Sequence, residues 1–96
     1  MTPAYLAAQR EIDEEILSYI REMQDTAPIR SESVCGFLVR IRRRRLMASY
    51  VADRLAYLVS RGFLEAKREW EGGEGEVTTY TISAAGRDVL DVVKPW

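Results

Sequence analysis

A glycine-rich stretch towards the C-terminal end limits the possible folds of this chain more than any other feature. Three of the five residues from 71 to 75 are glycine, and they separate two strand-like runs, residues 63–70 and 76–83. Short glycine-rich loops between two such runs are typical of β-hairpins. The register that places apolar side chains on one inward face pairs Leu64 with Ile82 and Ala66 with Tyr80.

Apolar spacing predicts three helices before the hairpin and one after it. The expected helices cover residues 4–23, from Ser31 or Ser33 as the capping residue to 41, 47–61, and 84–93. Pro28 keeps the first helix from continuing, because the residue before a proline disfavours helical backbone. Gly62 is expected to end the third helix as a left-handed cap.

Each predicted helix carries one apolar stripe that is expected to face the core. The stripes are Ile12, Ile16, Tyr19, Ile20 and Met23 with Leu17 on the flank, then Val34, Phe37, Leu38 and Ile41, then Met47, Val51, Leu55 and Leu58, and last Val89, Leu90 and Val93. We expect Asp13, Glu14 and Glu15 to lie on the solvated surface of the first helix. Gly36 predicts a close helix contact, because a glycine inside a helix costs about 1 kcal/mol relative to alanine.

The charged residues are distributed unevenly along the chain. Residues 1–29 have a net charge of −4, residues 30–68 of +7 and residues 69–96 of −4, although the whole chain carries only −1. The basic excess is densest at residues 40–45, where five of the six residues are arginine. A patch of this kind attracts a polyanion at short range, where salt screens least. The acidic ends argue against indiscriminate binding of nucleic acid.

The composition excludes several functional classes. With 47% hydrophobic and 30% charged residues, the chain has the composition of a globular domain. It contains no histidine, and its one cysteine, Cys35, is expected in the core. We therefore expect no enzyme, no catalytic residue, no metal and no cofactor. A single cysteine favours a cytoplasmic setting, and neither a signal peptide nor the ~20 apolar residues of a membrane span is found.

Two stretches resemble the winged helix-turn-helix family of DNA-binding domains. Residues 55–64, LAYLVSRGFL, are similar to the end of that family's recognition helix and the start of its wing. Residues 80–90, YTISAAGRDVL, are similar to its second wing strand and closing helix. Bacterial regulators of the multiple-antibiotic-resistance and phenolic-acid-responsive types show both. The resemblance implies an α+β fold for residues 1–96 as a single winged-helix domain: a three-helix core, a β-hairpin wing and a short C-terminal helix.

The resemblance implies a sequence-specific transcriptional regulator that binds double-stranded DNA. A recognition helix at about residues 47–61 would lie in the major groove and present its outward N-terminal residues to base edges. Arg54 would bind guanine through two hydrogen bonds, Asp53 would accept from cytosine, and Ser49 would bind a base or a phosphate, with Tyr50 beside them. The four arginines before this helix, Arg42, Arg43, Arg44 and Arg45, would bind phosphates.

Simpler structural roles remain open for several of these residues. Tyr50 and Tyr57 could cover the core, and Asp53 and Arg54 could form local ion pairs. Trp70, at the end of the first predicted strand, could stack on a base or pack against another chain.

The predicted wing departs from the family pattern in its charge. Its loop carries Glu71 and Glu74, and carboxylates repel phosphates. Lys67 and Arg68 are the remaining wing residues that could bind DNA. The acidic wing and first helix also favour an alternative function, that of a winged-helix module that binds a protein partner through a wing that does not contact DNA.

The two ends of the chain predict a homodimer. Apolar residues lie near both termini: Tyr5, Leu6, Val92, Val93 and Trp96. They exceed what the core of a small domain is expected to cover. A two-fold dimer also suits helix-turn-helix recognition of two DNA half-sites.

Overall fold

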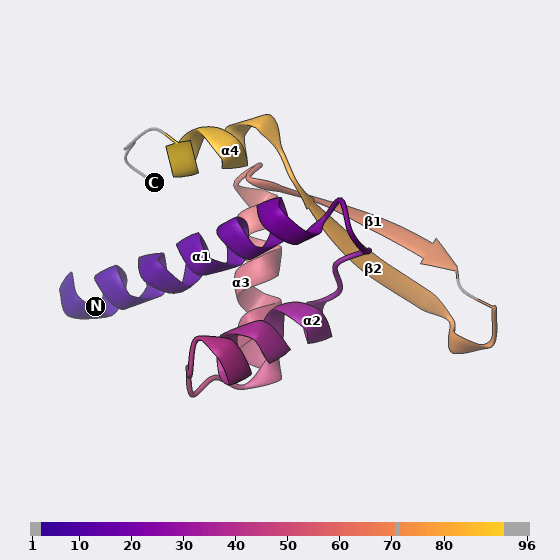
Figure 1. Ribbon diagram of the computed structural model, residues 1–96, viewed down its shortest axis with the longest axis horizontal. Coiled ribbons are helices and arrows are strands. Elements are labelled where there is room, and N and C mark those ends of the chain that lie inside the picture. Colours follow the sequence, from indigo (N-terminus) through magenta and orange to yellow (C-terminus); the bar gives the residue numbers. More distant parts are fainter. Residues whose placement is uncertain (1–2, 71, 92–96) are drawn as a thin grey trace.

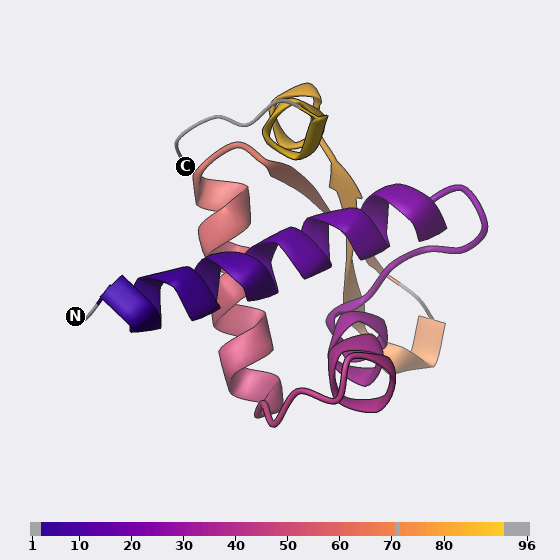
Figure 2. The same ribbon diagram turned by 60° about the vertical axis from the view of Figure 1, so that its left-hand side comes forward.

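The computed structural model describes residues 3–70 and 72–91 (Figure 1). Its elements are α1 (Pro3–Met23), α2 (Ser31–Gly36), the π-helical turn η1 (Phe37–Ile41), α3 (Ala48–Ser60), β1 (Leu64–Trp70), the 3₁₀ turn η2 (Gly72–Glu74), β2 (Glu76–Ile82) and α4 (Ala84–Asp91). Helix α1 crosses α3, with α4 on one side and α2 on the other (Figures 1 and 2). The four predicted helical regions and the hairpin are therefore all present.

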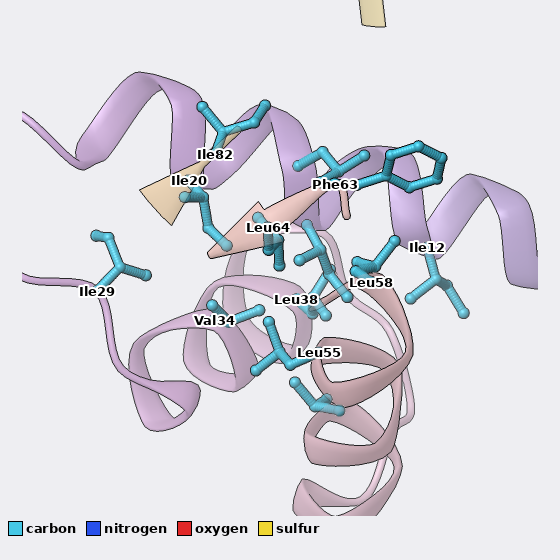
Figure 3. Close-up of a cluster of buried hydrophobic side chains, with 13 residues drawn as sticks. Ile12, Ile20, Ile29, Val34, Leu38, Leu55, Leu58, Phe63, Leu64 and Ile82 are labelled. Atoms are coloured by element: carbon cyan, nitrogen blue, oxygen red, sulfur yellow. The ribbon is translucent and has the colours of Figure 1, made fainter. Parts of the chain in front are cut away.

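The core lies where α1, α2, η1, α3 and the base of the hairpin meet (Figure 3). Its buried apolar side chains are Ile12, Ile16, Leu17, Ile20, Ile29, Val34, Leu38, Val51, Leu55, Leu58, Phe63, Leu64 and Ile82. Most of the predicted stripe positions are confirmed. On α1 the stripe is rotated, so that Leu17 is fully buried and Met23 is exposed. Val89 and Leu90 of α4 are half-buried, and Val93 lies outside the described residues.

The end of the second helical region differs from the prediction. The chain widens into η1, where the N–H of Arg42 donates to the carbonyl oxygen of Phe37 at 3.1 Å, five residues back. A π-turn contains more residues per turn than an α-helix, so it rotates Ile41 out of the apolar stripe. Met47 is the N-cap of α3 and lies outside the helix proper. Both side chains are largely exposed, and the prediction that they face the core is wrong.

Two further local predictions for this region are wrong. The N-cap of α2 is Arg30, and no side chain makes a capping hydrogen bond there, so neither Ser31 nor Ser33 is the cap. Gly36 does not face another helix. A Cβ at this position would lie 2.7 Å from Nη2 of Arg40, so the glycine leaves room for an arginine one turn later.

The predicted hairpin register is confirmed, with Leu64 opposite Ile82 and Ala66 opposite Tyr80. Only the base of the hairpin joins the core. Leu64 and Ile82 are buried, whereas Tyr80 is half-buried and Ala66 is exposed. The prediction that Ala66 faces the core is therefore wrong, because the hairpin projects beyond the helices after its first pair (Figure 1).

Backbone hydrogen bonds fix how the hairpin leaves the helices. Gly62 ends α3 with φ of 79°, as predicted, and the N–H of Phe63 donates to the carbonyl oxygen of Leu58 at 2.9 Å. On the outer edge of β2, Tyr80 N–H donates to the carbonyl oxygen of Ile29 at 2.9 Å. The segment after α1 thus covers part of an edge that would otherwise be open.

Candidate nucleic-acid interface

The arginine run forms the connection into α3. It begins with Arg40 in η1 and continues through residues 42–45, and the connection lies at the end of the molecule opposite α4 (Figures 1 and 2). Arg43 has φ of 59°, a left-handed conformation that is unfavourable for arginine by roughly 1–2 kcal/mol. The N–H of Arg44 donates to the carbonyl oxygen of Leu38 at 2.9 Å and closes this turn.

Two arginines of the run bind one carboxylate of α1. Glu15 accepts hydrogen bonds from Arg44 Nε at 3.1 Å, from Arg44 Nη2 at 2.6 Å and from Arg42 Nη2 at 3.1 Å. The exposed fractions of the side chains are 12% for Glu15, 28% for Arg44 and 53% for Arg42. Burial alone would raise the pKa of Glu15, but together the hydrogen bonds and charges of Arg44 and Arg42 outweigh it and lower the pKa. Glu15 therefore stays ionised at neutral pH. We call Arg42 and Arg44 the inward pair.

The other three arginines of the run have a different environment. Arg40, Arg43 and Arg45 are exposed. Within residues 3–70 and 72–91, no carboxylate forms an ion pair with any of them. We call these three the outward arginines. Their guanidinium groups are the part of the run that an external anion can reach without displacing a carboxylate of the described residues.

Helix α3 turns one face to the core and another to solvent. Val51, Leu55 and Leu58 are fully buried. Two of the predicted base-reading residues, Ser49 and Asp53, are exposed on the opposite side of the helix. Tyr50 is half-buried and packs against the core, which matches its simpler structural role.

Arg54 is bound within the protein. Its Nε and Nη2 donate to the two carboxylate oxygens of Asp13 on α1 at 2.9 and 2.5 Å, and its guanidinium lies over the ring of Tyr57, 4.4 Å from the centroid. The side chains of Asp13 and Arg54 are only 4% and 12% exposed. Burial raises the pKa of Asp13, although Arg54 acts in the opposite direction. The structure thus places Arg54 between two helices and not on the exposed face of α3.

The prediction that the carboxylates of α1 lie on a solvated surface is wrong for Asp13 and Glu15 and holds for Glu14, which is exposed. For Asp13, the sequence contains one indication that its side chain is buried. It lies four and seven residues before Leu17 and Ile20, so all three share one helical face, and that face is buried. A carboxylate on a buried face requires a cationic partner. For Glu15 no such indication exists, because its partners are brought to it by a turn 27 to 29 residues away.

Both cations of the wing, Lys67 and Arg68, are paired with carboxylates. Lys67 pairs with Glu69 at 2.7 Å, and Arg68 pairs with Glu76 at 3.5 Å, with both cations largely exposed. Exposed pairs of this kind contribute little stability. Trp70, at the end of β1, is also largely exposed. Glu71 and the side chain of Glu74 lie outside the described residues.

The predicted apolar termini are described only in part. Leu6 is exposed on the first turns of α1, which extend beyond the other elements (Figures 1 and 2). The side chain of Tyr5, and Val92, Val93 and Trp96, lie outside the described residues. Cys35 is half-buried beside the core and has no disulfide partner in the described part of the chain.

No group of three or more histidine, cysteine, aspartate or glutamate side chains in the described ranges is arranged to hold a metal ion. No described helix is both long and apolar enough to cross a membrane.

Solved structures share this arrangement of helices and hairpin. A PadR family transcription regulator from hypervirulent Clostridium difficile matches with a TM-score of 0.68 at 18% identity, over 85% of this chain and 81% of its own. A provisionally assigned transcriptional regulator from Thermoplasma acidophilum matches with a TM-score of 0.74 at 19% identity, over 88% and 78%. The chain has the winged-helix fold. The predicted α+β architecture and the resemblance to winged helix-turn-helix domains are thus confirmed at the level of the fold.

A third structure includes a bound nucleic acid. Bacillus subtilis PadR in complex with operator DNA matches with a TM-score of 0.69 at 16% identity, over 88% of this chain. The match covers 48% of that regulator, so this chain spans about half of its length. No protein-family model and no curated protein matches the sequence.

Proposed function

We propose that this chain is a sequence-specific DNA-binding transcriptional regulator that acts in the cytoplasm, with α3 as its recognition helix. One observation supports this most strongly: the outward arginines lie on the segment that leads into α3, and they have no ion pair with the described residues. In helix-turn-helix domains this end of the recognition helix enters the major groove. A solved winged-helix neighbour in complex with operator DNA supports the same function.

In this proposal some of the site residues contact DNA directly, and others hold α3 in place. The outward arginines Arg40, Arg43 and Arg45 bind phosphates and set the position of the protein on the duplex. Ser49 and Asp53 reach base edges, where the carboxylate of Asp53 accepts from the amino group of cytosine. Tyr50 and Arg54 act indirectly, because their side chains hold α3 against the core and α1.

The test removes two outward arginines, with Arg43→Gly and Arg45→Ala in one variant. Glycine is chosen at position 43 because it adopts the left-handed conformation without strain. Each lost phosphate contact makes the slope of log K against log salt shallower by about 0.9, and two contacts correspond to about a 30-fold loss of affinity at 150 mM salt. Binding is measured by fluorescence anisotropy on a duplex selected from random DNA by the unaltered protein.

A charge-matched control keeps the loop intact. Arg10→Ala with Arg87→Ala also removes two positive charges, one from α1 and one from α4, which lies opposite the connection into α3. We expect this control to change the affinity less than about threefold, because neither residue lies on the segment that leads into α3. Equal losses in the two variants, or no salt-dependent binding by the unaltered protein, would refute the proposed interface.

We also propose that the regulator is a homodimer. Leu6 is exposed on turns of α1 that extend beyond the other elements, which leaves part of the helix for a second copy. A two-fold dimer predicts that DNA sites selected from random sequence are inverted repeats, with half-sites about 10 base pairs apart or a multiple of that. A single asymmetric site, together with a monomer in sedimentation equilibrium at high concentration, contradicts the dimer.

The wing favours a second candidate function, a winged-helix module that binds protein. Both wing cations are already paired with carboxylates, while Trp70 is exposed at the end of β1. If this is the function, Lys67 and Arg68 contribute nothing to DNA binding, and the salt titration of the unaltered protein shows no duplex binding at all.

A further inference from the structure

The inward pair already binds a carboxylate, Glu15, with the hydrogen bonds that it could otherwise give to a phosphate. A guanidinium forms the same two-pronged hydrogen bonds with a carboxylate and with a phosphate. Glu15 accepts three such bonds, two from Arg44 and one from Arg42, and Glu11 lies 3.6 Å from Arg44 as a second anion. An external phosphate that approaches either arginine is repelled by this ionised carboxylate and competes with it for the guanidinium hydrogen bonds.

We propose that Glu15 withholds the inward pair from DNA and so limits sequence-independent affinity. The inference rests on the proposed function and deepens it. Phosphate contacts supply nearly all non-specific binding, so each arginine withheld weakens binding to every sequence alike. Contacts to base edges are unaffected, so the total affinity for every sequence is lower while the ratio of specific to non-specific affinity stays the same.

The backbone at Arg43 explains why the inward pair and the outward arginines point to different partners. Arg42 and Arg44 flank Arg43, whose left-handed backbone conformation interrupts the regular turn between them. The two flanking arginines thus bind Glu15 together, while Arg43 remains exposed. The two members differ in how firmly they are held. Arg42 is 53% exposed and makes one hydrogen bond, so it is the member that a phosphate would capture first once Glu15 is neutral.

Glu15→Gln tests the inference, because it removes the negative charge and keeps the size of the side chain. The freed arginines should steepen the slope of log K against log salt on a non-specific duplex by about 0.9 to 1.8. Non-specific affinity at 150 mM salt should rise about 5- to 30-fold, and affinity for the selected site should rise by a similar factor, because the added contacts are to phosphates. An unchanged or shallower slope would overturn the proposal.

Glu14→Gln is the matched control. It makes the same change of charge one residue away on α1, but Glu14 is exposed and pairs only with Arg10, at 3.8 Å, in the described part of the chain. We expect its slope to stay within about 0.3 of that of the unaltered protein, since Glu14 forms no ion pair with Arg42 or Arg44 among the described residues. If both variants steepen the slope equally, the effect is one of net charge, and Glu15 has no special role.

A second variant keeps the inference testable if Glu15→Gln does not fold, which thermal melting reveals. Arg42→Ala in the unaltered protein should leave the salt slope unchanged, whereas Arg43→Gly should make it shallower by about 0.9. Equal effects of the two substitutions would mean that Arg42 binds phosphate despite Glu15, and would overturn the inference.

Retention on immobilised heparin separates this inference from the proposed function. Heparin is a polyanion without base sequence, so it reports freed arginines even if the protein recognises no operator. Glu15→Gln should elute at higher salt than both the unaltered protein and Glu14→Gln. If the unaltered protein binds no duplex but this order of elution holds, the proposed function fails and the withholding by Glu15 stands. If duplex binding holds but the three proteins elute together, the inference fails alone.

Discussion

Replacing Arg54 with alanine is expected to lower the free energy of unfolding by about 3–5 kcal/mol. Arg54 is the described partner of the buried Asp13 carboxylate, and the two side chains join α3 to α1 through two hydrogen bonds. Without the guanidinium, a nearly fully buried carboxylate has neither a counter-charge nor its hydrogen bonds. Urea denaturation followed by circular dichroism measures the loss.

The neighbouring residue provides the control for this prediction. Asp53→Ala alters an exposed side chain on the same helix and should change the free energy of unfolding by less than about 0.5 kcal/mol. The double variant Asp13→Leu with Arg54→Met should recover most of the loss, because it removes both charges and fills the space with apolar atoms. If Arg54→Ala is as stable as Asp53→Ala, the ion pair does not hold the two helices together.

The loss of stability caused by Arg54→Ala should also depend on pH. Burial already raises the pKa of Asp13, and removing Arg54 raises it further. The folded state then keeps a proton that the unfolded state has released, so its stability falls as the pH rises between the unfolded and the folded pKa. The loss relative to the unaltered protein should therefore be smaller near pH 4 than near pH 7, by roughly 1 kcal/mol or more.

Gly86→Ala is expected to lower the free energy of unfolding by about 2–3 kcal/mol, against the ordinary preference of helices for alanine. Gly86 lies in the first turn of α4, directly against the chain that enters β1. A Cβ there would overlap the carbonyl oxygen of Phe63 and lie 2.7 Å from Cγ1 of Ile82. That carbonyl oxygen accepts a hydrogen bond from Ser83 N–H at 3.1 Å and belongs to the backbone, so it has little freedom to move. Thermal melting measures the effect.

Gly73→Ala is the control for this steric argument. No atom lies within 4 Å of a Cβ at position 73, and the residue does not have a positive φ. We expect the free energy of unfolding to change by less than about 0.5 kcal/mol. A stabilising Gly86→Ala would mean that helix propensity outweighs the contact, and that α4 is not held against Phe63 as described.

Local patterns were enough to predict most of the architecture. The hairpin register, the left-handed Gly62 and the buried face of α3 all follow from residues close together in the chain. Each depends on a short-range rule: alternation along a strand, the freedom of glycine at positive φ, or a period of 3.6 residues. The resemblance to the winged helix-turn-helix family added how these elements are arranged.

The same rules gave wrong predictions for two residues at the ends of helices, Ile41 and Met47. Ile41 has the correct spacing for the core, but the π-turn of η1 rotates it into solvent. Met47 fits the stripe of α3 by spacing, yet the helix begins only at Ala48. A pattern assumes a constant number of residues per turn, and neither position meets that assumption.

By itself, the sequence determined the helices, the hairpin and the presence of a concentrated basic segment, because these depend on near neighbours and on composition. Only the tertiary structure decided which arginines remain available to an anion. Arg42 and Arg44 meet Glu15, and Arg54 meets Asp13, across 27 to 41 residues of chain. An ion pair forms where folding brings two charges within a few ångströms, and no spacing along the chain specifies that distance.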